Sequence, residues 1–129
     1  MSQWLFPAAA AAAGGITLSH PATKTSTVTG TGVDISAYSG PLLVVQDVGT
    51  VSGTLPTLDG KIQDSPNNSD WTDVSGATFT QVTASNSLQS IVVQCNAVAQ
   101  YIRYIGTVGG SNPSYPLAVS AHGFKSTNT

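Results

Sequence analysis

Three short apolar runs constrain the fold of this chain more than any other feature of its sequence. They are rich in β-branched and aromatic residues, each is closed by Gly, Pro, Asn or Ser, and they span residues 42–48, 90–95 and 100–108. Such runs are typical of strands, because branched and aromatic side chains pack well on a pleated surface. The sequence therefore predicts an all-β fold, an antiparallel β-sandwich of jelly-roll-like type.

The spacing of the expected strands fits a sandwich. Strands are expected at 26–29, 42–48, 57–64, 78–83, 88–94, 100–108 and 115–122, with Trp71 on a short edge piece. They recur about every ten to fifteen residues, with turn residues between them, and the clusters at 64–70 and 109–114 predict loops. Alternation along the strands predicts a core that contains Val44, Leu58, Ile62, Trp71, Phe79, Val92, Ile102, Tyr104 and Val119.

The composition describes a neutral, hydroxyl-rich surface. Only 8% of the 129 residues are charged, against about 25% in an ordinary soluble domain. The net charge is −2, and the four cations are scattered at Lys24, Lys61, Arg103 and Lys125. Binding to DNA or RNA by phosphate neutralisation needs clustered cations, so no nucleic-acid partner is expected.

The first 24 residues differ from the rest of the chain. An aromatic cluster, a run of six alanines and a Gly-Gly pair precede a polar stretch. The apolar part has no basic start and about ten residues, whereas a membrane helix needs about twenty, so neither a secretory signal nor a membrane partner is expected. We expect residues 1–24 to form an arm that is disordered or extended unless it docks, 25–125 to form the sandwich, and 126–129 to form a tail.

The start of this arm carries the candidate contact residues Trp4, Leu5, Phe6 and Pro7. Three large apolar side chains gain a few kcal/mol together when a partner buries them. Fully extended, 24 residues reach about 80 Å, so the arm can bridge neighbouring subunits. The alternative is a frayed terminus without a role.

The motifs of catalysis and nucleotide binding do not appear in the sequence. It has no G-x-S-x-G elbow, and neither His20 nor His122 stands in a context that suggests a base. The stretch 30–35 starts like a G-x-G-x-x-G motif but has Ile35 in place of the third glycine. We therefore expect no enzymatic activity and no cofactor.

An oxygen-rich loop and the one cysteine can each be interpreted structurally or chemically. Asp64, Asn67, Asp70 and Asp73 place oxygen ligands in one loop, which leaves calcium as an alternative to ordinary turn residues. The one cysteine, Cys95, ends an apolar run and is expected to be a buried, inert thiol.

Four segments carry a resemblance to a known family. They are 33–40, 56–65, 70–82 with its Asp-Trp-Thr-Asp-Val and Phe-Thr-Gln-Val motifs, and the Tyr-Ile-Arg-Tyr strand at 101–104. Over about residues 25–125 the chain resembles the decoration, or cement, proteins of tailed double-stranded DNA bacteriophage capsids. The resemblance implies a virion protein on the outer surface of the head that crosslinks major capsid protein subunits, often as homotrimers at local threefold positions.

A carbohydrate-binding sandwich module of a secreted or virion-associated protein is the alternative function. Its aromatic residues Trp71, Tyr101 and Tyr115 would stack on sugar faces, although core packing explains the same residues. A tail or adhesion module is a third possibility. Arg103, an outward cation on a neutral strand, is either a contact residue or a cross-strand partner of an aspartate.

Overall fold

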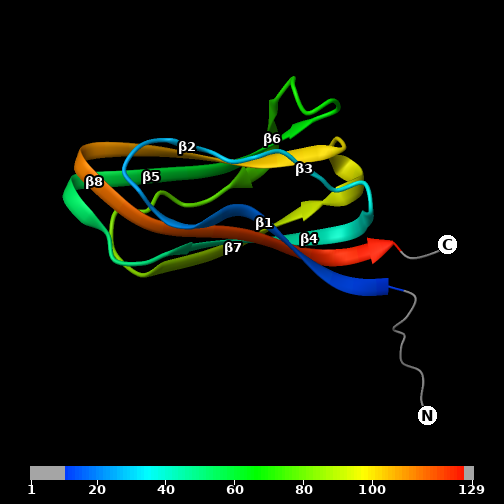
Figure 1. Ribbon diagram of the computed structural model, residues 1–129, viewed down its shortest axis with the longest axis horizontal. Coiled ribbons are helices and arrows are strands. Elements are labelled where there is room, and N and C mark those ends of the chain that lie inside the picture. The colour runs from blue at the N-terminus through cyan, green and yellow to red at the C-terminus, as the bar shows by residue number, and fades with distance from the viewer. Residues whose placement is uncertain (1–10, 127–129) are drawn as a thin grey trace, which may run out of the picture.

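The structure, a computed structural model, describes residues 11–126, which form strands and one short 3-10 turn (Figure 1). The elements are β1 (Ala11–Lys24), β2 (Val28–Thr29), β3 (Val33–Asp34), β4 (Tyr38–Val48), β5 (Ser52–Ser65), β6 (Thr72–Thr78), β7 (Ser87–Gln94), η1 (Cys95–Ala97) and β8 (Tyr101–Ser126). All strand pairs are antiparallel. The predicted all-β antiparallel fold is confirmed.

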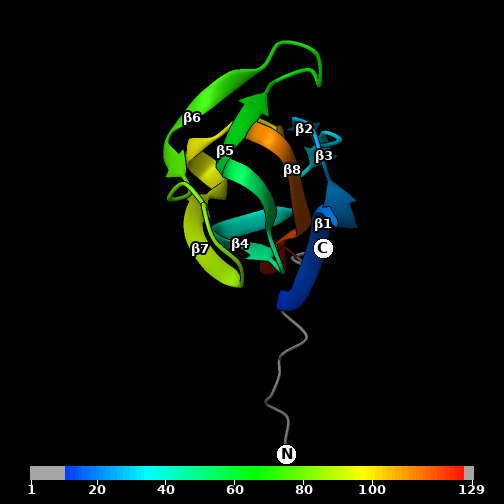
Figure 2. The ribbon, with the colours of Figure 1, turned by 90° about the vertical axis from the view of Figure 1, so that its left-hand side faces the viewer.

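Two sheets share the long strand β8 and enclose one core. In sheet I the order is β1-β8-β4-β7, and in sheet II it is β6-β5-β8, with β2 and β3 on the other side of β8. The first part of β8 pairs with β5, and the part from Tyr115 onward lies between β1 and β4. Seen along the long axis, the sheets curve around the interior (Figure 2).

The transition between the sheets lies in the segment 109–114, which was predicted to be a loop. The prediction of a loop is wrong, because β8 continues through this segment while Gly110 and Asn112 adopt positive φ angles of 104° and 49°. On β5, Gly53 and Leu55 have φ angles of 114° and 49° at the same bend. The turn-forming residues therefore bend two paired strands together instead of ending one.

The part of the predicted arm that the structure describes is an extended strand docked on the sandwich. Ala11–Lys24 forms β1 and pairs with β8 from Ala11 opposite Ser126 to Lys24 opposite Tyr115. Leu18 is buried in the core, and a Cβ on Gly14 would lie 2.8 Å from the Tyr38 hydroxyl, so this strand is fitted closely to the body. The β ladder overrides the helix propensity of the alanines. The predicted contact residues at positions 4–7 lie outside the described residues.

The predicted strands are otherwise recovered with altered ends. The first expected strand is reduced to Val28–Thr29, and 42–48, 57–64 and 88–94 fall within β4, β5 and β7. The strand expected at 78–83 is wrong, because β6 ends at Thr78. Phe79 and Val82 are both buried, and Val82 meets β5 only through a bridge to Leu58.

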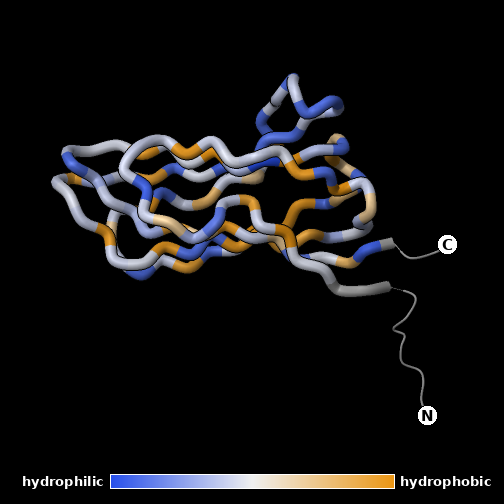
Figure 3. Tube along the Cα trace, viewed as in Figure 1, coloured by the Kyte–Doolittle hydropathy of each residue, from blue (hydrophilic) through white to orange (hydrophobic). Residues whose placement is uncertain are grey.

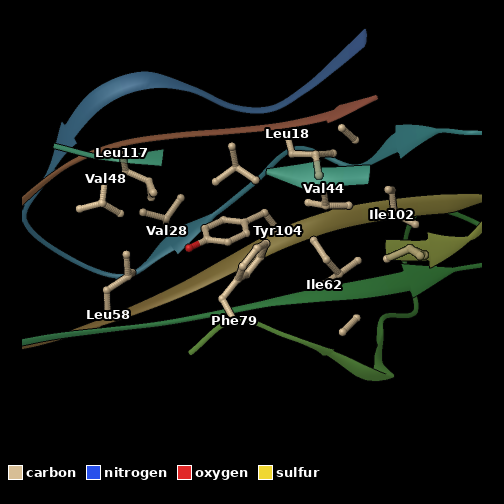
Figure 4. Packing of buried hydrophobic residues seen from close by; sticks show 14 of the residues in the cluster. Leu18, Val28, Val44, Val48, Leu58, Ile62, Phe79, Ile102, Tyr104 and Leu117 are labelled. Atoms are coloured by element: carbon tan, nitrogen blue, oxygen red, sulfur yellow. The ribbon is translucent and has the colours of Figure 1, made fainter. Parts of the chain in front are cut away.

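The core consists of residues from both sheets, and Figure 4 shows their packed side chains. Figure 3 shows that hydrophobic positions recur along the strands. Seven of the nine predicted core residues are buried: Val44, Leu58, Ile62, Phe79, Ile102, Tyr104 and Val119. The other two predictions are wrong, since Trp71 is half-buried and Val92 is 58% exposed. On β7 it is Val93 that faces the core, because alternation puts adjacent residues on opposite faces of a strand.

Tyr104 connects the two sheets through the core. Its side chain extends from β8 in sheet II, and its hydroxyl donates a 2.5 Å hydrogen bond to Gln46 Oε1 on β4 in sheet I. The directly paired Gly60 and Gly106 make room for the ring, since a Cβ on either would lie within 3.0 Å of Tyr104 atoms. The Phe79 ring packs against Tyr104 at a centroid distance of 6.2 Å (Figure 4).

The Tyr104–Gln46 pair gives a stability prediction. Tyr104→Phe leaves the buried Gln46 amide without its partner, and Gln46→Leu leaves the tyrosine hydroxyl unpaired, so each should lower the free energy of unfolding by about 1–3 kcal/mol. The double variant should lose clearly less than the sum, because both polar groups are then gone. Urea unfolding of the four proteins measures this coupling, and additive effects would contradict the bond.

The same hydroxyl predicts how stability changes in alkali. Burial, and to a smaller extent the charge of Asp59, raise the pKa of Tyr104 above its ordinary value. The unfolded chain therefore loses this proton first, so stability is fully present below about pH 10 and falls above it by about 1.4 kcal/mol per pH unit. Unfolding measured between about pH 9 and 11.5 should show a shallower loss in Tyr104→Phe. Parallel curves for the two proteins would contradict this.

Candidate interaction surface

The outer face of sheet I carries most of the large apolar side chains that the described residues expose. Five such side chains are exposed in all, and four of them lie on this face: Leu43 on β4, Leu88 and Val92 on β7, and Phe124 on β8. Their exposed fractions are 41%, 70%, 58% and 53%. Leu43, Val92 and Phe124 lie towards one end of this face, whereas Leu88 lies opposite the exposed Asp47. Exposed apolar side chains gathered on one face make this face the candidate interaction surface.

The strand register brings part of this face into one row. Gly15 on β1 pairs with His122 on β8, which pairs with Leu43 on β4, which pairs with Val92 on β7. Because Gly15 has no side chain, the surface of the sheet is recessed at the β1 end of this row. The result is a hollow of about 410 Å³, which we call the apolar hollow, lined by Gly14, Gly15, Leu43, His122, Gly123 and Phe124.

The apolar hollow lies at the end of the sandwich where the chain enters β1. This end also holds the last residues of β8, as the register of Ala11 with Ser126 requires (Figure 1). Residues 1–10 precede β1 directly in the sequence, and they include the apolar residues Trp4, Leu5 and Phe6. An apolar face and an apolar segment are therefore connected at one end of the molecule.

The outer face of sheet II is polar by contrast. Lys61 Nζ lies 3.0 Å from Asp73 Oδ2, Gln63 Nε2 donates to the other carboxylate oxygen at 2.8 Å, and Arg103 Nε donates to Gln63 Oε1 at 2.9 Å. The hydrogen bond from Gln63, and then that from Lys61, lower the pKa of Asp73. The Arg103 guanidinium lies over the Trp71 ring, 4.3 Å from its centroid. Arg103 is thus linked to an aspartate through Gln63.

These contacts bear on the aromatic residues of the carbohydrate-binding alternative. Tyr115 is fully buried and its hydroxyl donates to the Val82 carbonyl at 2.7 Å, so it cannot stack on a sugar. Arg103 covers one face of Trp71, and Tyr101 is half-buried. The three residues do not form one exposed aromatic platform.

The oxygen-rich loop uses its side chains for its own turn. Asn67 Oδ1 accepts the backbone N–H groups of Ser69 and Asp70, while the Asn67 amide donates to the Asp70 carboxylate at 2.7 Å. Asp64 accepts the Ala99 N–H instead, and Asp73 belongs to the polar face of sheet II. The four calcium candidates thus belong to three separate sets of contacts: Asn67 with Asp70, Asp64 with Ala99, and Asp73 with Lys61.

Two other candidate residues are placed by the structure. Cys95 is half-buried in η1, and burial raises the pKa of its thiol, which disfavours the reactive thiolate. His122 lies in the apolar hollow, where its Nε2 is 2.9 Å from Ser120 Oγ. Within residues 11–126 no carboxylate forms a hydrogen bond with this imidazole.

The sequence did contain a signal for the apolar face. The runs Leu42-Leu43-Val44-Val45 and Ile91-Val92-Val93 have apolar residues at successive positions, whereas a strand with one wet face alternates apolar and polar residues. Because adjacent side chains point to opposite faces, both faces of such a run are apolar. The predicted core drew on these runs, and the exposed Leu43 was missed. Leu88 and Phe124 lie outside the two runs and were also missed.

The fold is found in proteins of viral and prophage origin. A chain in the structure of infectious bursal disease virus, Gx strain, superimposes with a TM-score of 0.63 at 16% identity over 92% of this chain, which spans 33% of the viral chain. The SPBc2 prophage-derived protein YomS superimposes with a TM-score of 0.51 at 12% identity, over 89% of this chain and 95% of YomS. At these identities the likeness is one of fold.

No protein-family model matches the chain, and no curated protein matches it significantly. Membership of the decoration-protein family therefore stays a prediction from the sequence resemblance. Among residues 11–126, no helix is long and apolar enough to cross a membrane.

Proposed function

We propose that this protein is a structural capsid decoration protein that binds the outer surface of a phage head and crosslinks major capsid protein subunits. The observation that carries the proposal is the apolar outer face of sheet I, which joins the apolar N-terminal segment at one end of a β-sandwich. The fold likeness to a viral chain and a prophage-derived protein supports a viral structural role.

The physical properties of the chain suit such a role. A decoration protein must adhere through one surface and stay inert elsewhere, and the low charge limits electrostatic attraction to nucleic acid. The sandwich supplies a close-packed body that transmits load between the subunits it touches. The protein acts mechanically, as a brace against rupture of the shell, and needs neither a catalytic centre nor a cofactor.

Attachment in this proposal combines two contacts. Trp4, Leu5, Phe6 and Pro7 contact the major capsid protein, and the β7 side of the sheet I face, with Leu88 and Val92, rests on the shell. Exposed apolar side chains of this size stabilise a contact by about 25 cal/mol for each Å² that is buried. If the protein is a homotrimer at local threefold positions, three arms engage together, and their effective concentration makes attachment much tighter than one arm allows.

Residues 1–10, the part of the predicted arm that precedes β1, give a direct test of this function. Deleting residues 1–10 should abolish binding to purified phage heads that lack the protein, because the apolar cluster is lost. The melting temperature should stay unchanged, because β1 starts at Ala11 and keeps its pairing with β8. Deletion must not extend to Gly15, since that would remove part of sheet I. Binding is measured by co-sedimentation with the heads over a range of protein concentrations.

Two comparisons make the result specific. A variant with Trp4, Leu5 and Phe6 changed to Ser keeps the chain length and should fail to bind in the same way. Thr72→Ala, an exposed change on β6 of sheet II, should bind like the wild type. Unchanged saturation of heads by the truncated protein would show that the arm does not make the shell contact.

A further inference from the structure

Leu55 has an unusual position at the bend of the sandwich. Its side chain is 84% exposed, and its backbone has a φ of 49°, a conformation that glycine and asparagine adopt readily and leucine rarely does. It lies between Thr54 opposite Ser111 and Thr57 opposite Gly109, where β8 bends away from the two termini (Figure 1). An apolar side chain is thus held in water by a strained backbone, the kind of position that often has a function.

The apolar hollow lies at the other end of the molecule. Leu43 and Phe124 form its apolar wall, and Gly14 and Gly15 form its low side, next to the start of β1. A Cβ on Gly15 would be 3.6 Å from His122 Nδ1, an ordinary contact, and Gly15 does not have a positive φ. The fold therefore does not require a glycine here, but the open space of the hollow does.

We propose that Leu55 of one copy of this protein inserts into the apolar hollow of a second copy. Residues 53–57 are Gly-Thr-Leu-Pro-Thr, and the residues that line the hollow include no Lys, Arg, Asp or Glu. The contact therefore buries apolar surface on both sides without removing a charge from water. It gives the strained, exposed leucine a partner within the same protein.

The position of the two surfaces sets the kind of assembly. A tip at one end and a hollow at the other make a head-to-tail contact, which closes into a ring if the rotation between copies allows and otherwise extends. The contact goes beyond the proposed shell binding, because it joins copies of the protein in the absence of a shell. Leu88 on β7 stays outside the contact, since it does not line the hollow and pairs with Asp47, four residues further along β4 than Leu43.

The test uses one variant for each side of the contact. Leu55→Gly removes the side chain and suits the positive φ, so the protein should fold with a melting temperature at least equal to that of the wild type. Gly15→Val fills the hollow from β1 with a residue that favours strands. Association of the full-length chain is measured by sedimentation velocity from micromolar to millimolar concentration. Each variant should weaken association by about tenfold or more.

Matched controls lie outside the contact. Leu88→Ser removes a leucine that is 70% exposed on the sheet face that carries the hollow, and Thr17→Val changes the next outward residue on β1. Both should associate like the wild type. A wild type that stays monomeric at every concentration, or equal weakening by the controls, would overturn the proposal.

Mixing the two variants tests the head-to-tail geometry. Leu55→Gly keeps an intact hollow and Gly15→Val keeps an intact Leu55, so the mixture should form a dimer through one wild-type contact at concentrations where each variant alone is mainly monomeric. Native mass spectrometry identifies this heterodimer by its mass. No heterodimer in the mixture would contradict the contact, and because no phage head is present, the result is independent of whether the protein binds a shell.

Discussion

The cross-sheet hydrogen bond of Tyr104 is the interaction around which the rest of the structure is arranged. It joins β8 of sheet II to β4 of sheet I, and the space for the ring is made by the paired Gly60 and Gly106. Tyr104 is one of two fully buried tyrosines, and Phe79 packs against its ring. The Tyr104 side chain thus spans the space between the two sheets. The side chains on their outer faces take no part in this contact.

Those outer faces have opposite characters. The face of sheet II is covered by a connected polar network from Lys61 to Arg103, whereas the face of sheet I exposes Leu43, Leu88, Val92 and Phe124. A rigid body with one adhesive face fits a protein that is held by neighbours on a surface. Leu55 lies at the far end, at the bend of β8, so exposed apolar side chains occur at both ends of the long axis.

The sequence predicted the fold class and most of the core, because β-branched runs and their alternation record burial directly. Ile62 and Ile102 are examples, each with polar or half-buried neighbours on both sides. The prediction was wrong where the same residue pattern is compatible with two different structures. Gly110 and Asn112 are turn formers that here bend a continuous strand, and the alanines of β1 form strand because β8 offers a ladder. The prediction that Val92 is buried was wrong because an all-apolar run does not indicate which of its residues face inward.

The central claim is that the protein adheres to a virus shell as a structural component. Imaging of purified phage particles that encode the chain, with peptide mass spectrometry of the same particles, tests it most directly. The expected result is density for this sandwich in many copies on the outer surface of the head, with sheet I towards the shell. Particles that are complete and infectious without any copy of the chain on the head would contradict it.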